Sequence, residues 1–156
     1  MTQVAFHLNV PAAPQGWRAY LCRLLAKAHA SRARVWVAVA DDELTALDEA
    51  LWTLPADDFV PHVRYDAPAL LVQRSPIVLA PPTVPPQGQR GVVVNAQPQW
   101  LNWLDQAVQP ARVIEIVSTD DEAKAAARQR WRRYQQLGWE PQAHDRAARA
   151  GAPAQA

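Results

Sequence analysis

The chain has 156 residues, and its 16 lysine and arginine side chains nearly balance its 15 aspartate and glutamate side chains, giving a formal net charge of +1. This length fits one domain with a sizeable core, and the near-neutral charge argues against wholesale electrostatic binding to nucleic acid. Because Cys22 is the single cysteine and no apolar run approaches the ~20 residues of a membrane span, we expect a soluble, cytoplasmic protein without disulfides.

The first third of the chain alternates strand and helix patterns. These patterns predict a strand over 4–10, a helix over 17–30, a strand over 34–40 and a helix from 41 to about 52. The continuous apolar run of the second strand is typical of a central parallel strand covered on both faces. Asp41 or Asp42 is placed to cap the helix that follows.

Prolines interrupt regular structure in the middle of the chain, over 54–89. Within this segment a short strand is predicted over 76–80, and a weaker strand pattern covers 70–72. Beyond it the patterns predict a strand over 91–95, a helix over 97–108, a strand over 112–117 and a helix over 120–137.

The end of the chain carries both helix signals and a polar tail. Ser118 or Thr119 is placed to cap the last helix, and Gly138 is placed to stop it. The segment 140–156 is rich in Ala, Pro, Gln and Arg, so we predict a disordered tail there and a single folded domain over 1–139.

Strands that alternate with helices predict an α/β fold with three layers, a mostly parallel sheet covered by helices on both faces. Such folds often bind nucleotides. Neither GxxxxGK[ST] nor GxGxxG occurs, however, and the turn NVPAAPQG after the first strand lacks the glycines that let a backbone approach a phosphate. We therefore expect a nucleotide-binding-like fold that lacks a phosphate loop.

The residues that usually carry catalysis are scattered. The four histidines have no metal-ligand spacing, and none of the three serines lies in GxSxG. We therefore expect no metal, no cofactor and no catalytic residue. His62, close to Asp57 and Asp58 in sequence, is the one conceivable acid or base.

Charge is unevenly distributed along the chain. The segment 41–63 holds seven acidic residues and no Lys or Arg, whereas 124–133 holds five basic residues and no acid. Two patches of opposite sign suggest two different partners.

The basic patch lies on the last predicted helix. At about 100° per residue, one arc of roughly 100° carries Lys124, Arg128, Trp131, Arg132 and Gln135. The neighbouring arc turns Tyr134 and Leu137 toward the sheet. The basic stripe is either a solvated face, or a groove for a peptide with acidic residues and a free carboxyl end, or a track for single-stranded nucleic acid.

The acidic patch contains LDEALWTLPADDFVPH, residues 47–62, in which Trp52 and Phe59 are either core anchors or a docking surface. Its LDEALW, Pro55 and FVPH resemble the signature of the chi subunit of bacterial DNA polymerase III. The late helix resembles that family's ARxRYxxY motif with its following glycine, and Trp131 stands where the family often has Tyr.

This resemblance implies a non-enzymatic adaptor of the clamp loader, which links the polymerase III holoenzyme, through the psi subunit, to the acidic C-terminal tail of single-stranded DNA-binding protein. The implied tail-binding residues are Lys124, Arg128, Trp131, Arg132, Val117 and Leu137. The implied surface for psi, or for a repair helicase, comprises Trp52, Phe59, Pro61 and His62. Little direct DNA binding is expected. A direct single-strand binder and a degenerate nucleotide hydrolase are the alternatives.

Overall fold

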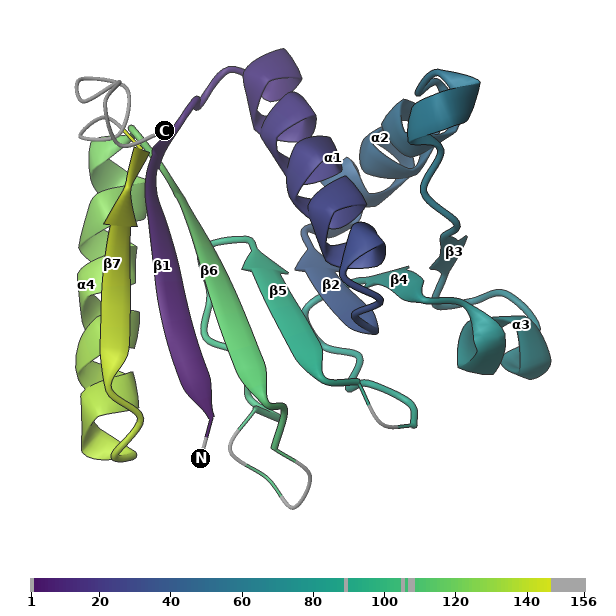
Figure 1. Ribbon diagram of the computed structural model, residues 1–156. Helices are drawn as coiled ribbons and strands as arrows, with labels where there is room; N and C mark the ends of the chain where they lie inside the picture. Colours follow the sequence, from purple (N-terminus) through teal and green to yellow (C-terminus); the bar gives the residue numbers. More distant parts are fainter. Residues whose placement is uncertain (1, 89, 105, 107–108, 147–156) are drawn as a thin grey trace.

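The computed structural model describes residues 2–88, 90–104, 106 and 109–146. In this part of the chain seven strands form one sheet in the order β3-β4-β2-β5-β6-β1-β7, and neighbouring strands are parallel (Figure 1). The strands are β1 (Gln3–Val10), β2 (Val35–Val39), β3 (Val63–Arg64), β4 (Ile77–Ala80), β5 (Val92–Ala96), β6 (Arg112–Ser118) and β7 (Pro141–Asp145).

Helices cover both faces of this sheet, so the predicted three-layer α/β fold is confirmed. They are α1 (Pro14–Ala30), α2 (Asp41–Trp52), α3 (Ala69–Arg74) and α4 (Asp121–Gln136), with a short 3₁₀ turn, η1 (Ala56–Asp58). Figure 1 shows α1 and α2 on one side of the sheet and α4 on the other side, behind β7. None of the described helices is long and apolar enough to cross a membrane.

Strand β2 is buried on both faces of the sheet and contributes to a separate hydrophobic core on each. All five of its residues are buried, and because successive side chains point to opposite faces, Val35, Val37 and Val39 enter the core beneath α1 and α2. Trp36 and Ala38 enter the core on the other face, to which α3, the turn with Leu101 and α4 also contribute. The prediction of a central parallel strand is therefore confirmed.

The predicted helix over 97–108 is wrong for its described residues, which form turns and bends. Leu101 and Leu104 are fully buried, and the Leu104 amide donates to the Leu101 carbonyl at 3.0 Å. The three-residue spacing of these two leucines therefore comes from a buried turn. A short helix would show the same spacing, which is why the sequence predicted one. The weak strand over 70–72 is also wrong, because these residues lie in α3. Residues 105, 107 and 108 lie outside the described residues.

The predicted helix caps are not formed by side chains. The N-cap of α2 is Ala40, and Asp41 and Asp42 follow it inside the first turn, where their charges still favour the positive end of the helix. The N-cap of α4 is Asp120, whose amide donates to the Ser118 hydroxyl at 3.2 Å in a turn that precedes the helix.

The tail prediction is wrong for 141–145, which form strand β7. This strand pairs with β1 in register, with Val4 opposite Pro141 and Leu8 opposite Asp145. Without β7, β1 would be an exposed sheet edge with unpaired backbone groups, and backbone pairing needs no apolar pattern in the added strand. The sheet thus continues past residue 139, while 147–156 lie outside the described residues.

Candidate functional site

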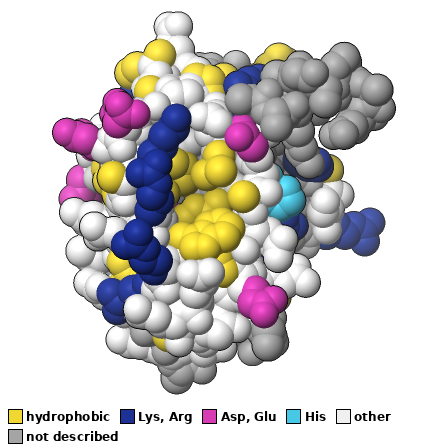
Figure 2. Space-filling model, turned by 90° about the vertical axis from the view of Figure 1, so that its left-hand side faces the viewer, with side chains coloured by type: hydrophobic (Ala, Val, Ile, Leu, Met, Phe, Trp, Pro, Cys, Tyr) yellow, Lys and Arg dark blue, Asp and Glu magenta, His cyan; other side chains and the backbone are white. Residues whose placement is uncertain are grey.

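A hollow of about 530 Å³ lies between α4 and the strands β1 and β6, and we call it the α4 groove. Its lining residues come from α4 (Lys124, Ala127, Arg128, Trp131, Arg132, Gln135), from β1 (Phe6, Leu8, Asn9) and from β6 (Val117). Figure 2 shows this face of the molecule, with a column of basic side chains beside an apolar hollow. The structure therefore brings the predicted basic stripe together with apolar residues of two strands.

The floor of the groove is apolar and firmly packed. Phe6 and Val117 are buried, and the ring of Trp131 lies against Phe6 with centroids 5.0 Å apart. Trp131 is half-buried, so part of its surface still faces the groove. Such a floor can accept an apolar or aromatic ligand side chain, as aromatic anchors do in protein interfaces.

The rim of the groove carries positive charge. Arg128 and Arg132 are exposed and Lys124 is half-buried. Of the carboxylates in the part of the chain that the structure describes, none forms an ion pair with these three groups. Because a guanidinium can hold a carboxylate through two parallel hydrogen bonds, the rim can bind a ligand carboxylate without first breaking an internal pair.

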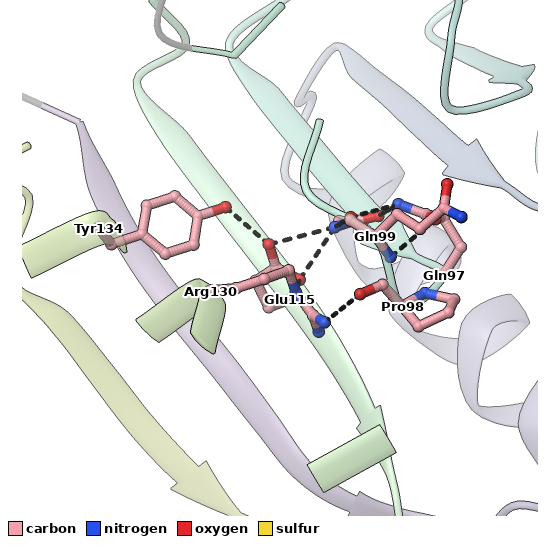
Figure 3. Close-up of polar contacts among 7 residues, drawn as sticks. Gln97, Pro98, Gln99, Glu115, Arg130 and Tyr134 are labelled. Carbon is pink, nitrogen blue, oxygen red and sulfur yellow. Dashed lines mark hydrogen bonds and ion pairs between the residues drawn. The ribbon is translucent and has the colours of Figure 1, made fainter. Parts of the chain in front are cut away.

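A buried polar network fixes α4 on the sheet (Figure 3). The carboxylate of Glu115 on β6 accepts hydrogen bonds from Arg130 Nε at 2.9 Å, from the Tyr134 hydroxyl at 2.6 Å and from Asn95 Nδ2 at 3.1 and 3.2 Å. Burial raises the pKa of Glu115, and the Arg130 charge opposes that rise. Burial and the nearby Glu115 also raise the pKa of Tyr134 well above its usual value, so its hydroxyl stays a donor.

This network was not predicted, although the sequence carries a signal for it. Glu115 interrupts the apolar run RVIEIV, and a charge at such a position needs a buried partner. The predicted inward turn of Tyr134 is confirmed, because this side chain is fully buried. Leu137 is different: it is 36% exposed at the C-cap of α4 and lies outside the groove, so its predicted inward turn is wrong.

The segment 47–62 forms a second surface, which we call the aromatic corner, built by Trp52, Phe59 and His62. Trp52 is 60% exposed and Phe59 39% exposed, with ring centroids 5.4 Å apart. The core-anchor interpretation is therefore wrong for both. Pro61 is half-buried beside them. The aromatic corner ends α2, on the opposite face of the sheet from α4 (Figure 1).

His62 supports this corner from beneath. Its ring is buried and lies 5.0 Å from that of Trp52. Its Nδ1 donates to the Val60 carbonyl at 2.7 Å, and its Nε2 lies 3.0 Å from Asp48 Oδ1. Asp57 and Asp58, its neighbours in sequence, are exposed on η1 instead. Both ring nitrogens thus face groups of the protein, which gives an acid or base role no support.

The edge where parallel strands end is where open α/β sheets usually bind ligands. A crevice of about 540 Å³ lies there, and its lining includes Glu43, Asp120 and Glu122. Arg130, also in the lining, is held by Glu115. This crevice is therefore poorly suited to a phosphate. Among the described residues no group of three or more His, Cys, Asp or Glu could hold a metal ion.

Sequence comparisons match the chain to one protein family. Residues 1–142 match the family described as DNA polymerase III chi subunit, HolC. The chain is 29% identical over 121 residues to DNA polymerase III subunit chi of Escherichia coli strain K12, covering 76% of this chain and 78% of that protein. It is 28% identical over 145 residues to DNA polymerase III subunit chi of Pseudomonas aeruginosa, covering 92% of this chain and 96% of that protein.

A solved structure shows the same fold at low sequence identity. The C-terminal domain of the DEAD-box protein Dbp5 superposes with a TM-score of 0.60 over 92% of this chain and 90% of that chain. Its sequence identity is 11%, so this likeness concerns the nucleotide-binding-like fold alone.

Proposed function

The chain belongs to the DNA polymerase III chi subunit family and is a replication accessory subunit, and on this premise we propose that it is a non-catalytic adaptor in the cytoplasm. It links the clamp loader, through the psi subunit, to the acidic C-terminal tail of single-stranded DNA-binding protein. The α4 groove receives the tail, and the aromatic corner receives psi or, in its place, a repair helicase.

The observation that carries the proposal is the pairing of a cationic rim with an apolar floor in the α4 groove. Arg128 or Lys124 holds the terminal carboxylate of the tail, and Arg132 attracts its acidic residues. The terminal phenylalanine enters beside Trp131, over Phe6 and Val117. Leu137 is exposed at the end of α4 and is not among the residues that line the groove, so its contact with the tail stays a prediction.

The aromatic corner supports the second half of the proposal. Exposed Trp52 and Phe59 are the side chains that most often anchor protein interfaces, while buried His62 holds the Trp52 ring in place. Because the two surfaces lie on opposite faces of the sheet, a partner on one leaves the other open.

The decisive experiment is a calorimetric titration of the chain with a peptide that ends in acidic residues followed by Pro-Phe and a free carboxyl group. We expect a Kd in the micromolar range that rises with salt, and a loss of about tenfold or more in affinity with Arg128→Ala. Arg23→Ala is the matched control, because Arg23 is exposed on α1, on the other face of the sheet. Equal binding by wild type and Arg128→Ala would refute the assigned site.

A direct single-strand binder could use the same groove, but it would stack bases on exposed aromatic faces. Trp131 instead packs against Phe6 and is half-buried, which favours the peptide. The two functions separate in an anisotropy measurement with a labelled oligonucleotide. We expect Arg128→Ala to leave any oligonucleotide signal unchanged while it weakens peptide binding by about tenfold or more. A nucleotide hydrolase is tested by incubation with ATP and magnesium, in which we expect no turnover.

A further inference from the structure

The edge of the sheet where the strands begin carries a second concentration of positive charge. Strands β2, β5 and β6 are neighbours, and their register places Val35 opposite Val92 and Val92 opposite Arg112. Arg34 immediately precedes β2, so it lies at nearly the same level as Arg112, two strands away. Adjacent strands are about 4.8 Å apart, so the two backbones are separated by about 10 Å.

A hollow of about 570 Å³ opens at this edge, and four arginines line it: Arg32, Arg34, Arg90 and Arg112. We call these four residues the basic edge. The other lining residues are small or uncharged, such as Ala33, Gly91 and Gln109, and no described acidic residue is among them. The crevice at the opposite edge of the sheet has acidic residues in its lining, so the two edges differ in sign.

Arg90 is the unusual member of the basic edge. It is only 5% exposed, and its Nη atoms donate to the backbone carbonyls of Ser75, Pro76 and Val72. Its Nε is buried without a hydrogen-bond partner among the described residues, and no described carboxylate pairs with the guanidinium. Burial, and secondly the charge of Arg34, lower the pKa of Arg90 to about 10.

Arg90 is therefore a cation in a hollow open to solvent, and none of the described carboxylates neutralises it. A bound anion would offset the repulsion between Arg34 and Arg90. The hollow differs from the α4 groove in having no aromatic residue in its lining, so it offers no floor for a peptide side chain. Guanidinium groups on small neighbours are suited to phosphate, which they bind bidentately.

We propose that the basic edge binds the phosphate backbone of nucleic acid, independently of the α4 groove. Phosphates of one strand recur about every 3.4 Å along a duplex. The backbones of Arg34 and Arg112 are about 10 Å apart, so two or three phosphates fit between these residues. So few contacts give weak binding that salt removes, and they carry no base specificity. The near-neutral net charge of the chain fits a local contact of this kind.

The test is fluorescence anisotropy of the full chain with a labelled oligonucleotide of ~20 nucleotides, single-stranded in one arm and duplex in the other, at salt from ~50 to ~200 mM. Arg32→Ala/Arg112→Ala removes two exposed arginines of the basic edge, neither of which makes a hydrogen bond to a described residue through its side chain. The control, Arg128→Ala/Arg132→Ala, changes the net charge equally on the α4 groove.

We expect Arg32→Ala/Arg112→Ala to weaken binding about fivefold at the lowest salt and to lower the slope of log K against log salt by about one to two. The control should bind the oligonucleotide within about twofold of wild type, whereas it alone should lose the acidic peptide. Because each double variant should weaken a different ligand, the measurements separate the basic edge from the proposed tail site. Either proposal can therefore fail without the other.

Three results would overturn the proposal. The first is no oligonucleotide binding at low salt, and the second is equal weakening of oligonucleotide binding by both double variants. The third is binding of a polyglutamate peptide in place of the oligonucleotide, if Arg32→Ala/Arg112→Ala abolishes that binding. Circular dichroism and an unchanged peptide Kd verify that the variant is folded. Arg34→Gln is a second variant with the same expected direction, since the Gln73 carbonyl at the surface is the one described group to which the Arg34 side chain donates.

Discussion

The ring of Trp131 lies against the ring of Phe6, with centroids 5.0 Å apart, so one side chain from α4 and one from β1 share the floor of the α4 groove. Phe6 also meets Tyr134 edge-on at 5.8 Å, and Tyr134 is held by the buried Glu115. The groove is therefore built before any ligand arrives. A preformed site avoids much of the ordering cost that a mobile site pays on binding.

Replacing Trp131 tests this floor directly. Trp131→Ala should weaken binding of the acidic peptide by about tenfold, because truncating an interface aromatic typically costs more than 1 kcal/mol of binding free energy. Trp131→Tyr keeps a ring over Phe6 and should stay within about threefold of wild type. Calorimetric titration measures both. If Trp131→Ala binds as tightly as wild type, the terminal phenylalanine does not enter beside this ring.

Tyr134→Phe should lower the free energy of unfolding by about 1.5–3 kcal/mol, because it removes a hydrogen bond to a buried carboxylate. Tyr65→Phe is the matched control, since the Tyr65 hydroxyl makes no hydrogen bond to a described residue, and its effect should be within about 0.5 kcal/mol. Urea denaturation measures both. Similar losses in the two variants would mean that the Glu115 network contributes nothing specific.

The difference in unfolding free energy between wild type and Tyr134→Phe should depend on pH with a definite sign. Burial and Glu115 raise the pKa of Tyr134 well above 10, so the hydroxyl contribution is fully present below the unfolded value of about 10. It is lost as the pH rises through the higher folded value. The stability gap between wild type and Tyr134→Phe should be constant from pH 7 to about 9 and should narrow above about 10. Narrowing already below pH 9 would contradict this assignment.

Much of the fold could be predicted because its signals are local. The apolar run of β2 reflects burial on both faces, and the basic stripe of α4 follows from helical geometry alone. The prediction for Leu137 failed although its backbone is still helical and its amide donates to the Arg133 carbonyl at 3.1 Å, because the side chain is 36% exposed at the last turn of α4. A helical wheel gives the direction of a side chain but not whether another element covers it.

The rest of the groove could not be predicted because sheet order is not local. Phe6, Leu8 and Asn9 join the site only because β1 lies beside β6, and β7 beside β1. Strand β7 itself has few apolar residues and is held by pairing with β1, so no hydrophobic period marks it. For Trp52 and Phe59 the residue types alone leave core and docking surface open, and the expectation of a surface comes from the family resemblance.

Trp52→Ala and Phe59→Ala should each abolish capture of clamp-loader subunits or of a helicase from an extract of the source cell, without loss of the acidic peptide. Because Trp52 is 60% and Phe59 39% exposed, stability should change by less than about 1 kcal/mol. Leu71→Ala is the control, since Leu71 is 51% exposed on α3 and lies outside the corner. Loss of the same partners with Leu71→Ala would show that the binding surface is assigned wrongly.

Gly138→Ala tests the turn that leads the chain from α4 into β7. Gly138 has φ of 79°, and the Trp139 amide donates to the Tyr134 carbonyl at 3.0 Å, which closes the helix. An added Cβ would meet no atom within 4 Å, so the expected loss of about 1–2 kcal/mol in unfolding free energy comes from the left-handed backbone alone.

Gly91→Ala is the matched control for this substitution, because its Cβ also meets open space but its backbone is not left-handed. It should be neutral or should stabilise the chain by up to about 1 kcal/mol, since alanine restricts the unfolded state. Urea denaturation compares the two variants. If both shift stability equally, the left-handed turn at Gly138 is not what sets the path of the chain into β7, and the strand is held by its pairing with β1 alone.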